Sequence, residues 1–148
     1  MAEQAFKAKL PSGLSRTEKL DIADRVIEFI LRRTEGGKDK DGKNFPKYSK
    51  EYVKSLDFRV AGKSRGSVNL TLSGDMLAAI ELLNPEVSRN VLRIGIPASD
   101  TENSAKAEGN IKGSYGGSPN PRKARDFLGI KKSDLDKIIE NVIEDSRG

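Results

Sequence analysis

Cysteine, histidine and tryptophan are absent from this sequence of 148 residues, and aromatic residues make up only 5% of it. Without cysteine, disulfides and thiolate metal sites are excluded. Without histidine, the chain lacks the commonest general base and the commonest transition-metal ligand, which also excludes Ser-His and Cys-His nucleophilic sites and a conventional zinc site. Carboxylate or lysine chemistry remains possible in principle. We therefore expect a protein that is not an enzyme and that binds no cofactor and no metal.

Long apolar runs are absent too. No stretch approaches the roughly 18 apolar residues of a membrane-spanning helix, and the N-terminus lacks the apolar core of a signal peptide. Hydrophobic residues make up 35% of the chain and charged residues 33%, so the core is expected to be small. We expect a soluble chain that is intracellular when it is made.

The net charge of +5 is unevenly distributed. Residues 1–73 carry sixteen Lys/Arg and ten Asp/Glu (+6), whereas residues 74–148 carry eleven and twelve (−1). Within the second half, residues 104–132 hold seven basic and two acidic side chains, and residues 133–145 hold one basic and five acidic. Such alternating blocks favour head-to-tail contacts between copies, in which opposite patches meet. An ordinary solvated surface explains the same blocks equally well.

Apolar periodicity, capping residues and chain breakers predict a flexible N-terminal arm at 1–13 and a single α+β domain at 14–148. Its sheet is expected to be small and antiparallel or mixed, packed by a long N-terminal helix and a C-terminal amphipathic helix, with long loops. The expected elements are, in order, helices at 16–34 and 50–56, a strand at 68–72, a helix at 73–83, a strand at 91–96, one helical turn at 104–107 and a last helix capped by Ser133.

Two loop motifs resemble ligand sites only superficially. Asp39 and Asp41 suggest a calcium-binding loop, but the required spacing would place a glycine and a tyrosine at two of the ligand positions. The segment Gly62–Ser64 suggests the end of a phosphate-binding loop, but an aspartate stands where the upstream glycine belongs. We interpret both segments as charged turns.

The segment Gly109–Ile130 is the most distinctive part of the chain. Glycine, proline, asparagine and serine are so frequent in its first half that residues 109–126 are predicted to form an extended loop. A basic run, Arg122–Arg125, and an apolar pair, Phe127 and Leu128, follow. Because loops of this length inside a compact domain are commonly functional, we interpret this one as a contact with a partner.

Two groups of residues carry this interpretation. The residues predicted at a partner or oligomer interface are Tyr115, Arg122, Lys123, Arg125, Phe127 and Leu128. The residues predicted to face DNA in a channel, through non-specific and salt-sensitive phosphate contacts, are Lys63, Arg65 and Lys112. Two alternatives stay open. Phe127 and Leu128 also fit a role in closing the chain's own core, and the basic run also fits either DNA or the acids of a neighbouring subunit.

Three stretches together resemble a known family. They are Asp41–Phe45 followed by Tyr48 and Ser49, then Leu70–Leu77, and finally Ala124–Ile130, which leads into an acidic amphipathic helix. In this order they resemble the neck and tail-completion proteins of tailed bacteriophages, a group similar to the virion morphogenesis proteins of Mu-like phages. The resemblance covers roughly residues 40–145.

The resemblance implies an α+β structural subunit of the virion head–tail junction. Such a subunit forms a homo-oligomeric ring, of about six or twelve copies, around the DNA channel. It contacts portal or adaptor proteins and tail-terminator proteins, with non-specific contact to packaged DNA, in the virion and, during assembly, in the host cytoplasm. The alternative function is a basic nucleic-acid-binding module, although the few aromatic residues are not interleaved with the basic clusters as stacking platforms would be.

Overall fold

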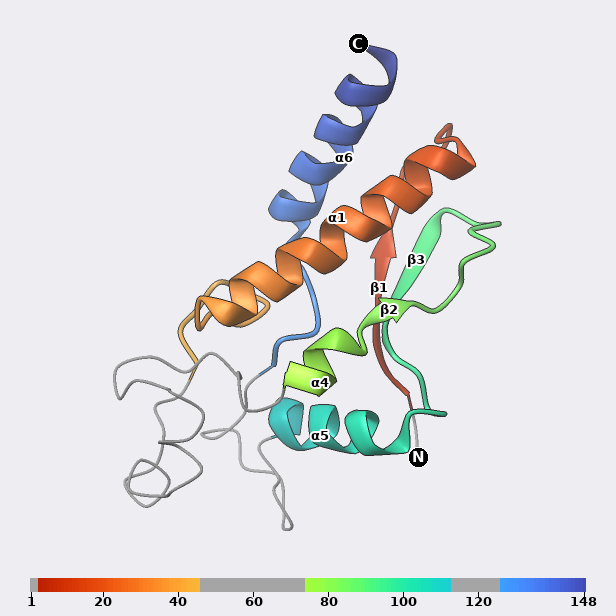
Figure 1. Ribbon diagram of the computed structural model, residues 1–148. Coiled ribbons are helices and arrows are strands. Elements are labelled where there is room, and N and C mark those ends of the chain that lie inside the picture. The colour runs from red at the N-terminus through yellow and green to blue at the C-terminus, as the bar shows by residue number, and fades with distance from the viewer. Residues whose placement is uncertain (1–2, 46–73, 113–125) are drawn as a thin grey trace.

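The computed structural model describes residues 3–45, 74–112 and 126–148, and over these ranges it shows an α+β fold (Figure 1). Helices pack on a small antiparallel sheet, which confirms the predicted fold class. The elements are β1 (Gln4–Lys9), α1 (Arg16–Glu35), α4 (Gly74–Ala78), β2 (Glu81–Leu82), β3 (Val91–Ile96), α5 (Thr101–Lys112) and α6 (Lys132–Arg147).

The sheet has the spatial order β1-β3-β2. β1 pairs with β3 along its whole length, from Gln4 opposite Ile96 to Lys9 opposite Val91. β3 was predicted as a strand at 91–96, and this prediction is confirmed. α1 crosses in front of the sheet in Figure 1, and α5 contacts both long strands. The central strand β3 thus contacts both α1 and α5.

The prediction of a flexible arm at 1–13 is wrong, because residues 4–9 form strand β1. Phe6, Ala8 and Leu10 alternate with lysines, and both Ala8 and Leu10 are buried in the core. The backbone N–H of Leu10 extends the pairing by donating to the carbonyl of Asn90. Alanine and lysine are poor strand formers, so this alternation gave a weak signal that only pairing with β3 makes stable.

α1 confirms the helix predicted at 16–34. Ser15 and Glu18 form a complete capping box, in which each side chain accepts a hydrogen bond from the other residue's backbone N–H. Ile22, Val26 and Ile30 are fully buried on the face of α1 that packs into the core. Residues spaced three to four apart share one face of a helix, so this apolar stripe fixes which side of α1 meets the sheet.

α6 confirms the predicted C-terminal helix but not its start. The helix begins at Lys132, its N-cap is Lys131, and no side chain caps it, so the predicted Ser133 cap is wrong. Its buried residues are Leu135, Ile139 and Val142, on the apolar stripe that the sequence predicts. α6 lies along α1 in Figure 1, and this helix pair makes one of the main contacts of the fold.

The segment before β3 is strand where a helix was predicted. The helix expected at 73–83 ends at Ala78, and Glu81 and Leu82 form β2. The Asn84 side chain explains the turn, because its amide donates to the carbonyl of Val91 and its oxygen accepts from the N–H of Arg93. These hydrogen bonds close the connection between β2 and β3. The helix prediction was wrong here because local helix propensity takes no account of such side-chain bonds to the backbone.

α5 is a full helix where one turn was predicted. Its buried residues are small or polar, namely Ser104, Ala107, Gly109 and Asn110. The sequence therefore has no stripe of large apolar residues that would predict the full helix. The loop predicted at 109–126 is therefore wrong over residues 109–112, which belong to α5. The helix predicted at 50–56 and the strand predicted at 68–72 lie outside the described residues. Within the described ranges, no helix combines the length and apolarity needed to cross a membrane.

Gly95 sets how closely β1 approaches the central strand. It lies opposite Ala5 on β1 and Glu81 on β2, and a Cβ atom placed on it would overlap the backbone of Gln4 and Ala5. We expect Gly95→Ala to push β1 away and to lower the free energy of unfolding by about 1–3 kcal/mol. Urea unfolding checks the loss, and hydrogen exchange over residues 4–9 checks its location.

The control variant for this prediction is Gly36→Ala at the end of α1. Gly36 has a negative φ of −78°, and an added Cβ would meet the nearest backbone atoms at ordinary distances of 3.4 and 3.5 Å. We expect a change of less than about 0.5 kcal/mol. If the two variants were equally stable, the close approach at Gly95 would not be what holds β1 in place.

Candidate protein-interaction surface

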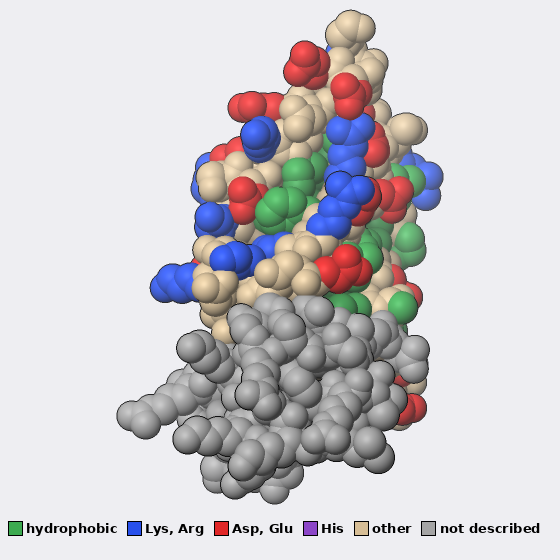
Figure 2. All heavy atoms as spheres, turned by 60° about the vertical axis from the view of Figure 1, so that its left-hand side comes forward, with side chains coloured by type: hydrophobic (Ala, Val, Ile, Leu, Met, Phe, Trp, Pro, Cys, Tyr) green, Lys and Arg blue, Asp and Glu red, His purple; other side chains and the backbone are tan. Residues whose placement is uncertain are grey.

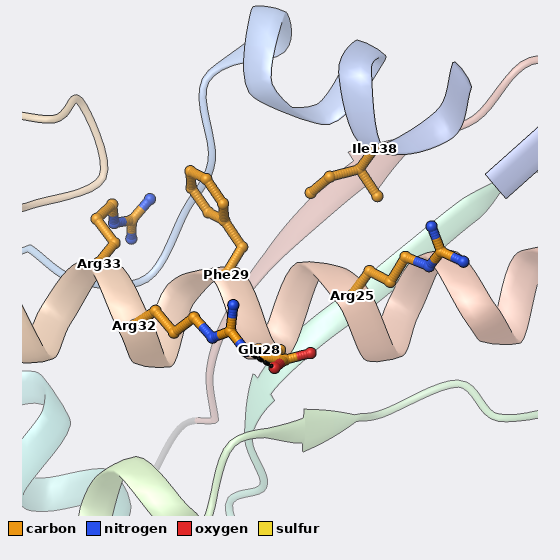
Figure 3. A pocket seen from close by; sticks show the side chains of 6 residues that line it. All are labelled: Arg25, Glu28, Phe29, Arg32, Arg33 and Ile138. Atoms are coloured by element: carbon orange, nitrogen blue, oxygen red, sulfur yellow. Dashed lines mark hydrogen bonds and ion pairs between the residues drawn. The ribbon is translucent and has the colours of Figure 1, made fainter. Parts of the chain in front are cut away.

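A shallow groove of about 520 Å³ runs between α1 and α6. Its lining residues are Arg25, Glu28, Phe29, Arg32 and Arg33 from α1, and Ile138 from α6 (Figure 3). The molecule also exposes hydrophobic side chains among charged side chains of both signs on the face drawn in Figure 2. The groove is thus an apolar floor with a rim rich in guanidinium groups. We call it the arginine groove.

Helical spacing explains how α1 builds the rim. Arg25, Phe29 and Arg33 follow one another at intervals of four residues, so they share one flank of the helix. Figure 3 shows Phe29 reaching toward α6, from which Ile138 projects into the same gap. Phe29 interrupts the polar face of α1 in the sequence, and in the structure it is half-buried at the edge of the α1–α6 contact.

Arg33 is the most enclosed of the three arginines. Its guanidinium donates to the carbonyl oxygens of Phe127 (2.6 Å), Gly129 (2.8 Å) and Lys40 (3.4 Å) and lies 5.7 Å from the centre of the Phe29 ring. Burial lowers the pKa of Arg33, but an arginine stays protonated in proteins. In the described part of the chain it has no carboxylate within ion-pair distance. Its direct contacts are neutral carbonyls and an aromatic face, and four more distant carboxylates, with Asp39 the strongest, favour its charge.

The other two arginines are paired differently. Arg25 bridges Asp21 (3.1 Å) and Asp145 (2.8 Å), and hydrogen bonds to these carboxylates raise its pKa. This bridge joins α1 to α6. Among the described residues, Arg32 pairs with Glu28 on its own helix and with no other carboxylate, and its side chain is 78% exposed. An exposed pair of this kind contributes only about 0.3–0.5 kcal/mol, so Arg32 is readily available to an incoming carboxylate.

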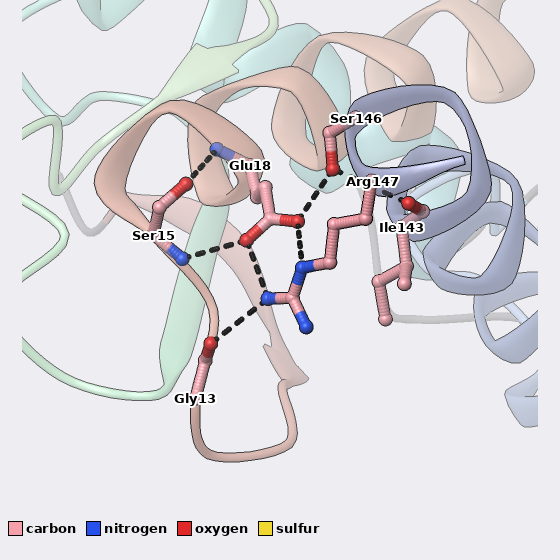
Figure 4. Close-up of polar contacts among 6 residues, drawn as sticks. All are labelled: Gly13, Ser15, Glu18, Ile143, Ser146 and Arg147. Carbon is pink, nitrogen blue, oxygen red and sulfur yellow. Dashed lines mark hydrogen bonds and ion pairs between the residues drawn. The ribbon is translucent and has the colours of Figure 1, made fainter.

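A second polar cluster joins the opposite end of α6 to the start of α1 (Figure 4). The Glu18 carboxylate accepts hydrogen bonds from Arg147, Ser146 and the backbone N–H of Ser15. Arg147 also donates to the carbonyl of Gly13. The hydrogen bonds from Arg147, followed by those from Ser146 and Ser15, lower the pKa of Glu18 to about 2. This buried carboxylate therefore fixes one end of the groove's α6 wall.

The structure describes three of the residues predicted at functional positions. Phe127 and Leu128 are 0% and 6% exposed and belong to the chain's own core, which is the alternative that the sequence left open. In this conformation neither side chain offers appreciable surface to a partner. Lys112 is exposed at the end of α5 and pairs with Glu108 at 2.9 Å. The other predicted site residues lie outside the described ranges: Lys63, Arg65, Tyr115, Arg122, Lys123 and Arg125.

The arginine groove was not predicted from the sequence. Its signal was present in Phe29, the one large apolar residue out of place on a charged helix face. The groove also needs Ile138, which is about a hundred residues away and which the sequence pattern assigned simply to the apolar stripe of α6. Only the packing of α1 against α6 brings the two together.

The charged loop after α1 uses its acids internally. The Asp39 carboxylate accepts hydrogen bonds from the backbone N–H groups of Asp41 and Lys43, both at 2.9 Å. Lys38 and Asn44 form a bridge across the same turn. Among the described residues, no cluster of three acids is arranged to hold a metal ion. The geometry is that of a self-capped turn, as the sequence indicated.

Comparisons with known proteins do not add to this picture. The chain matches no known family model, and neither curated proteins nor solved structures gave a significant match.

Arg33→Lys tests the role of the half-buried guanidinium. An ammonium group cannot donate to three carbonyls in the fixed fork geometry of arginine, so carbonyls of the Phe127–Gly129 segment would lose their partner. We expect the free energy of unfolding to fall by about 1–3 kcal/mol in urea titrations. Arg32→Lys is the matched control and should change stability by less than about 0.5 kcal/mol. Equal effects at the two positions would contradict a special role for Arg33.

Glu18→Gln tests the cluster at the other end of α6 through its pH dependence. The folded-state pKa of about 2 lies below the ordinary value of 4.5, so the charged form stabilises the fold at neutral pH. That stabilisation is complete above about pH 5 and is lost as the pH falls from 4.5 toward 2. At pH 7 we expect the wild type to have a higher melting temperature than Glu18→Gln. The difference between the two melting temperatures should shrink as the pH falls from 4.5 toward 2. Glu86→Gln, at an exposed loop position, should show no such gap.

Proposed function

We propose that this chain is a structural subunit of the head–tail junction of a tailed bacteriophage, a neck or tail-completion protein that assembles into a ring and is not an enzyme. In this role it joins portal or adaptor proteins to the tail around the DNA channel. Its place is the virion, and the host cytoplasm during assembly.

The arginine groove is the observation that carries the assembly role. Arginine and aromatic residues are enriched in protein–protein interfaces, because both bury much area and bond in defined directions. Here three arginines surround half-buried Phe29 and Ile138 on an open surface. The groove is shallow, which suits a protein surface better than a small substrate that must be enclosed.

The resemblance to phage neck proteins is the reason for proposing the head–tail junction as the assembly in which this chain takes part. Its third stretch, Ala124–Ile130, leads directly into the helix that walls the groove. The described part of this stretch seats Phe127 in the core and holds Gly129 at a φ of 154°, a conformation that favours glycine. A Phe-Leu-Gly pattern before an acidic helix therefore has a structural reason in this chain, namely to set the angle at which α6 meets α1.

The DNA channel is the part of the proposal that concerns the basic residues. Lys112 is exposed, which is compatible with a phosphate contact. The roles of the six predicted residues that lie outside the described ranges stay predictions. A ring subunit needs only weak and sequence-independent phosphate contacts, since packaged DNA moves through the channel.

Negative-stain electron microscopy of the purified full chain, alone and after mixing with portal rings from the same source, tests the proposal. We expect rings of the protein alone, or a new layer of density on the portal, because a junction subunit must bind its neighbours. A chain that stays monomeric and does not bind the portal would contradict the proposal. Tight duplex binding at physiological salt, with a steep salt dependence, would favour a nucleic-acid-binding module instead.

A further inference from the structure

The flank of α6 that faces away from the arginine groove is acidic around one apolar residue. Ile143 is half-buried, and Glu140 lies three residues before Ile143 and four before Glu144, so Glu140 neighbours both of them on the helix surface. Both glutamates are exposed, and neither forms an ion pair with any part of the chain that the structure describes. Like charges one helical turn apart repel, so a partner that supplies positive charge would relieve this repulsion.

The opposite flank of the same helix forms the groove. Ile138 lines it, and Asp145, seven residues further on, binds Arg25 of α1. α6 therefore separates two surfaces with matching properties. One has an apolar floor with arginines at its rim, and the other has an apolar residue with glutamates beside it. We call the second surface the acidic flank.

We propose that the arginine groove of one copy receives the acidic flank of α6 from a second copy. In this contact Ile143 of one copy covers Phe29 and Ile138 of the next, and Glu140 and Glu144 approach Arg32. The inference rests on the proposed ring assembly and names the surfaces through which copies join.

Charge decides which rim residues attract the flank. Arg25 already has two carboxylate partners, whereas Arg32 has one weak and exposed partner and Arg33 has only carbonyls within the described chain. Arg32 provides the accessible contact, and Arg33, which also lines the groove, adds a second positive charge that nearby carboxylates such as Asp39 offset only in part. A carboxylate near both gains favourable electrostatic energy in a site that the apolar floor partly shields from water.

The contact is head-to-tail because the two surfaces differ. When one patch of each copy binds another patch of the next, every copy keeps one free groove and one free flank, so the chain of contacts continues until it closes. A groove that met a second groove would instead stop at a dimer. Phosphate is a poorer occupant than the flank, because it would leave the Phe29 and Ile138 floor exposed.

The natural absence of cysteine makes disulfide trapping a clean test. We would introduce Arg32→Cys and Glu144→Cys, singly and together, into the full chain and oxidise it alone and with portal rings. An internal disulfide is excluded by geometry. Asp145 contacts Arg25, and Arg32 lies seven residues further, about 10 Å along α1, beyond the span of a disulfide. We expect a ladder of dimers, trimers and larger species from the double variant.

Mixing the single variants distinguishes the possible arrangements. The two together should give a crosslinked heterodimer at least about tenfold more abundant than either homodimer, whereas a groove-to-groove contact would crosslink Arg32→Cys alone. Lys9→Cys paired with Glu144→Cys is the control and should stay monomeric on a non-reducing gel. No enriched heterodimer and no ladder, with or without portal rings, would overturn the proposal.

Charge reversal provides a second readout that does not depend on crosslinking. Arg32→Glu and the double change Glu140→Lys with Glu144→Lys should each weaken self-association about tenfold or more in sedimentation velocity. Mixed together, they should regain self-association, because the reversed groove of one variant and the reversed flank of the other again carry opposite charges. The exposed changes Glu86→Lys and Arg89→Glu should have no effect. Duplex DNA binding that Arg32→Glu abolishes, with self-association unchanged, would assign the groove to phosphate and overturn the proposal.

Failure of this proposal and failure of the proposed function give different results. A chain that binds portal rings but shows neither the ladder nor the effect of charge reversal keeps its junction role and loses this contact. A chain that self-associates through the groove but does not bind portal rings would support the proposed contact and contradict the junction role.

Discussion

The half-buried guanidinium of Arg33 is the constraint on which the described architecture depends. It stands near the end of α1 and binds backbone carbonyls of Lys40, Phe127 and Gly129, which belong to two segments far apart in the sequence. A carbonyl withdrawn from water must find a donor, and arginine offers several donors in one rigid plane. Through this one side chain, the turn after α1 and the segment before α6 are both held against the same helix. The Lys40–Asp126 ion pair, at 3.2 Å, reinforces the same junction.

The second attachment of α6 lies at the other end of the helix pair, where Glu18 binds Arg147 and Ser146. Between the two attachments α6 buries Leu135, Ile139 and Val142 in the core, and the groove lies between the two helices. Both walls are thus fixed by buried polar contacts whose loss would leave unpaired groups. A surface held in this way is organised before a partner arrives, which reduces the entropy lost on binding.

The sequence correctly predicted the elements that have a clear local periodicity of apolar residues. The boundaries of α1, its capping box, strand β3 and the apolar stripe of α6 all follow from spacing and chain breakers. It failed where a tertiary contact overrides a weak local preference. β1 consists mainly of alanines and lysines, and Gly95 allows it to approach β3 closely. β2 exists because Asn84 ties its turn, and α5 packs through small residues that leave no hydrophobic signal. The groove was missed for the same reason, since Phe29 and Ile138 meet only in three dimensions.

The position of Phe127 changes how the motif around it is understood. A sequence that places an aromatic residue after a basic run invites an interface role, yet the ring is fully buried and its carbonyl binds Arg33. Its contribution to any assembly is therefore indirect. Phe127 anchors the chain in the core shortly before α6, a helix that carries Ile138 on one flank and Ile143 on the other. A change at Phe127 is therefore expected to disturb the start of α6 and with it both flanks.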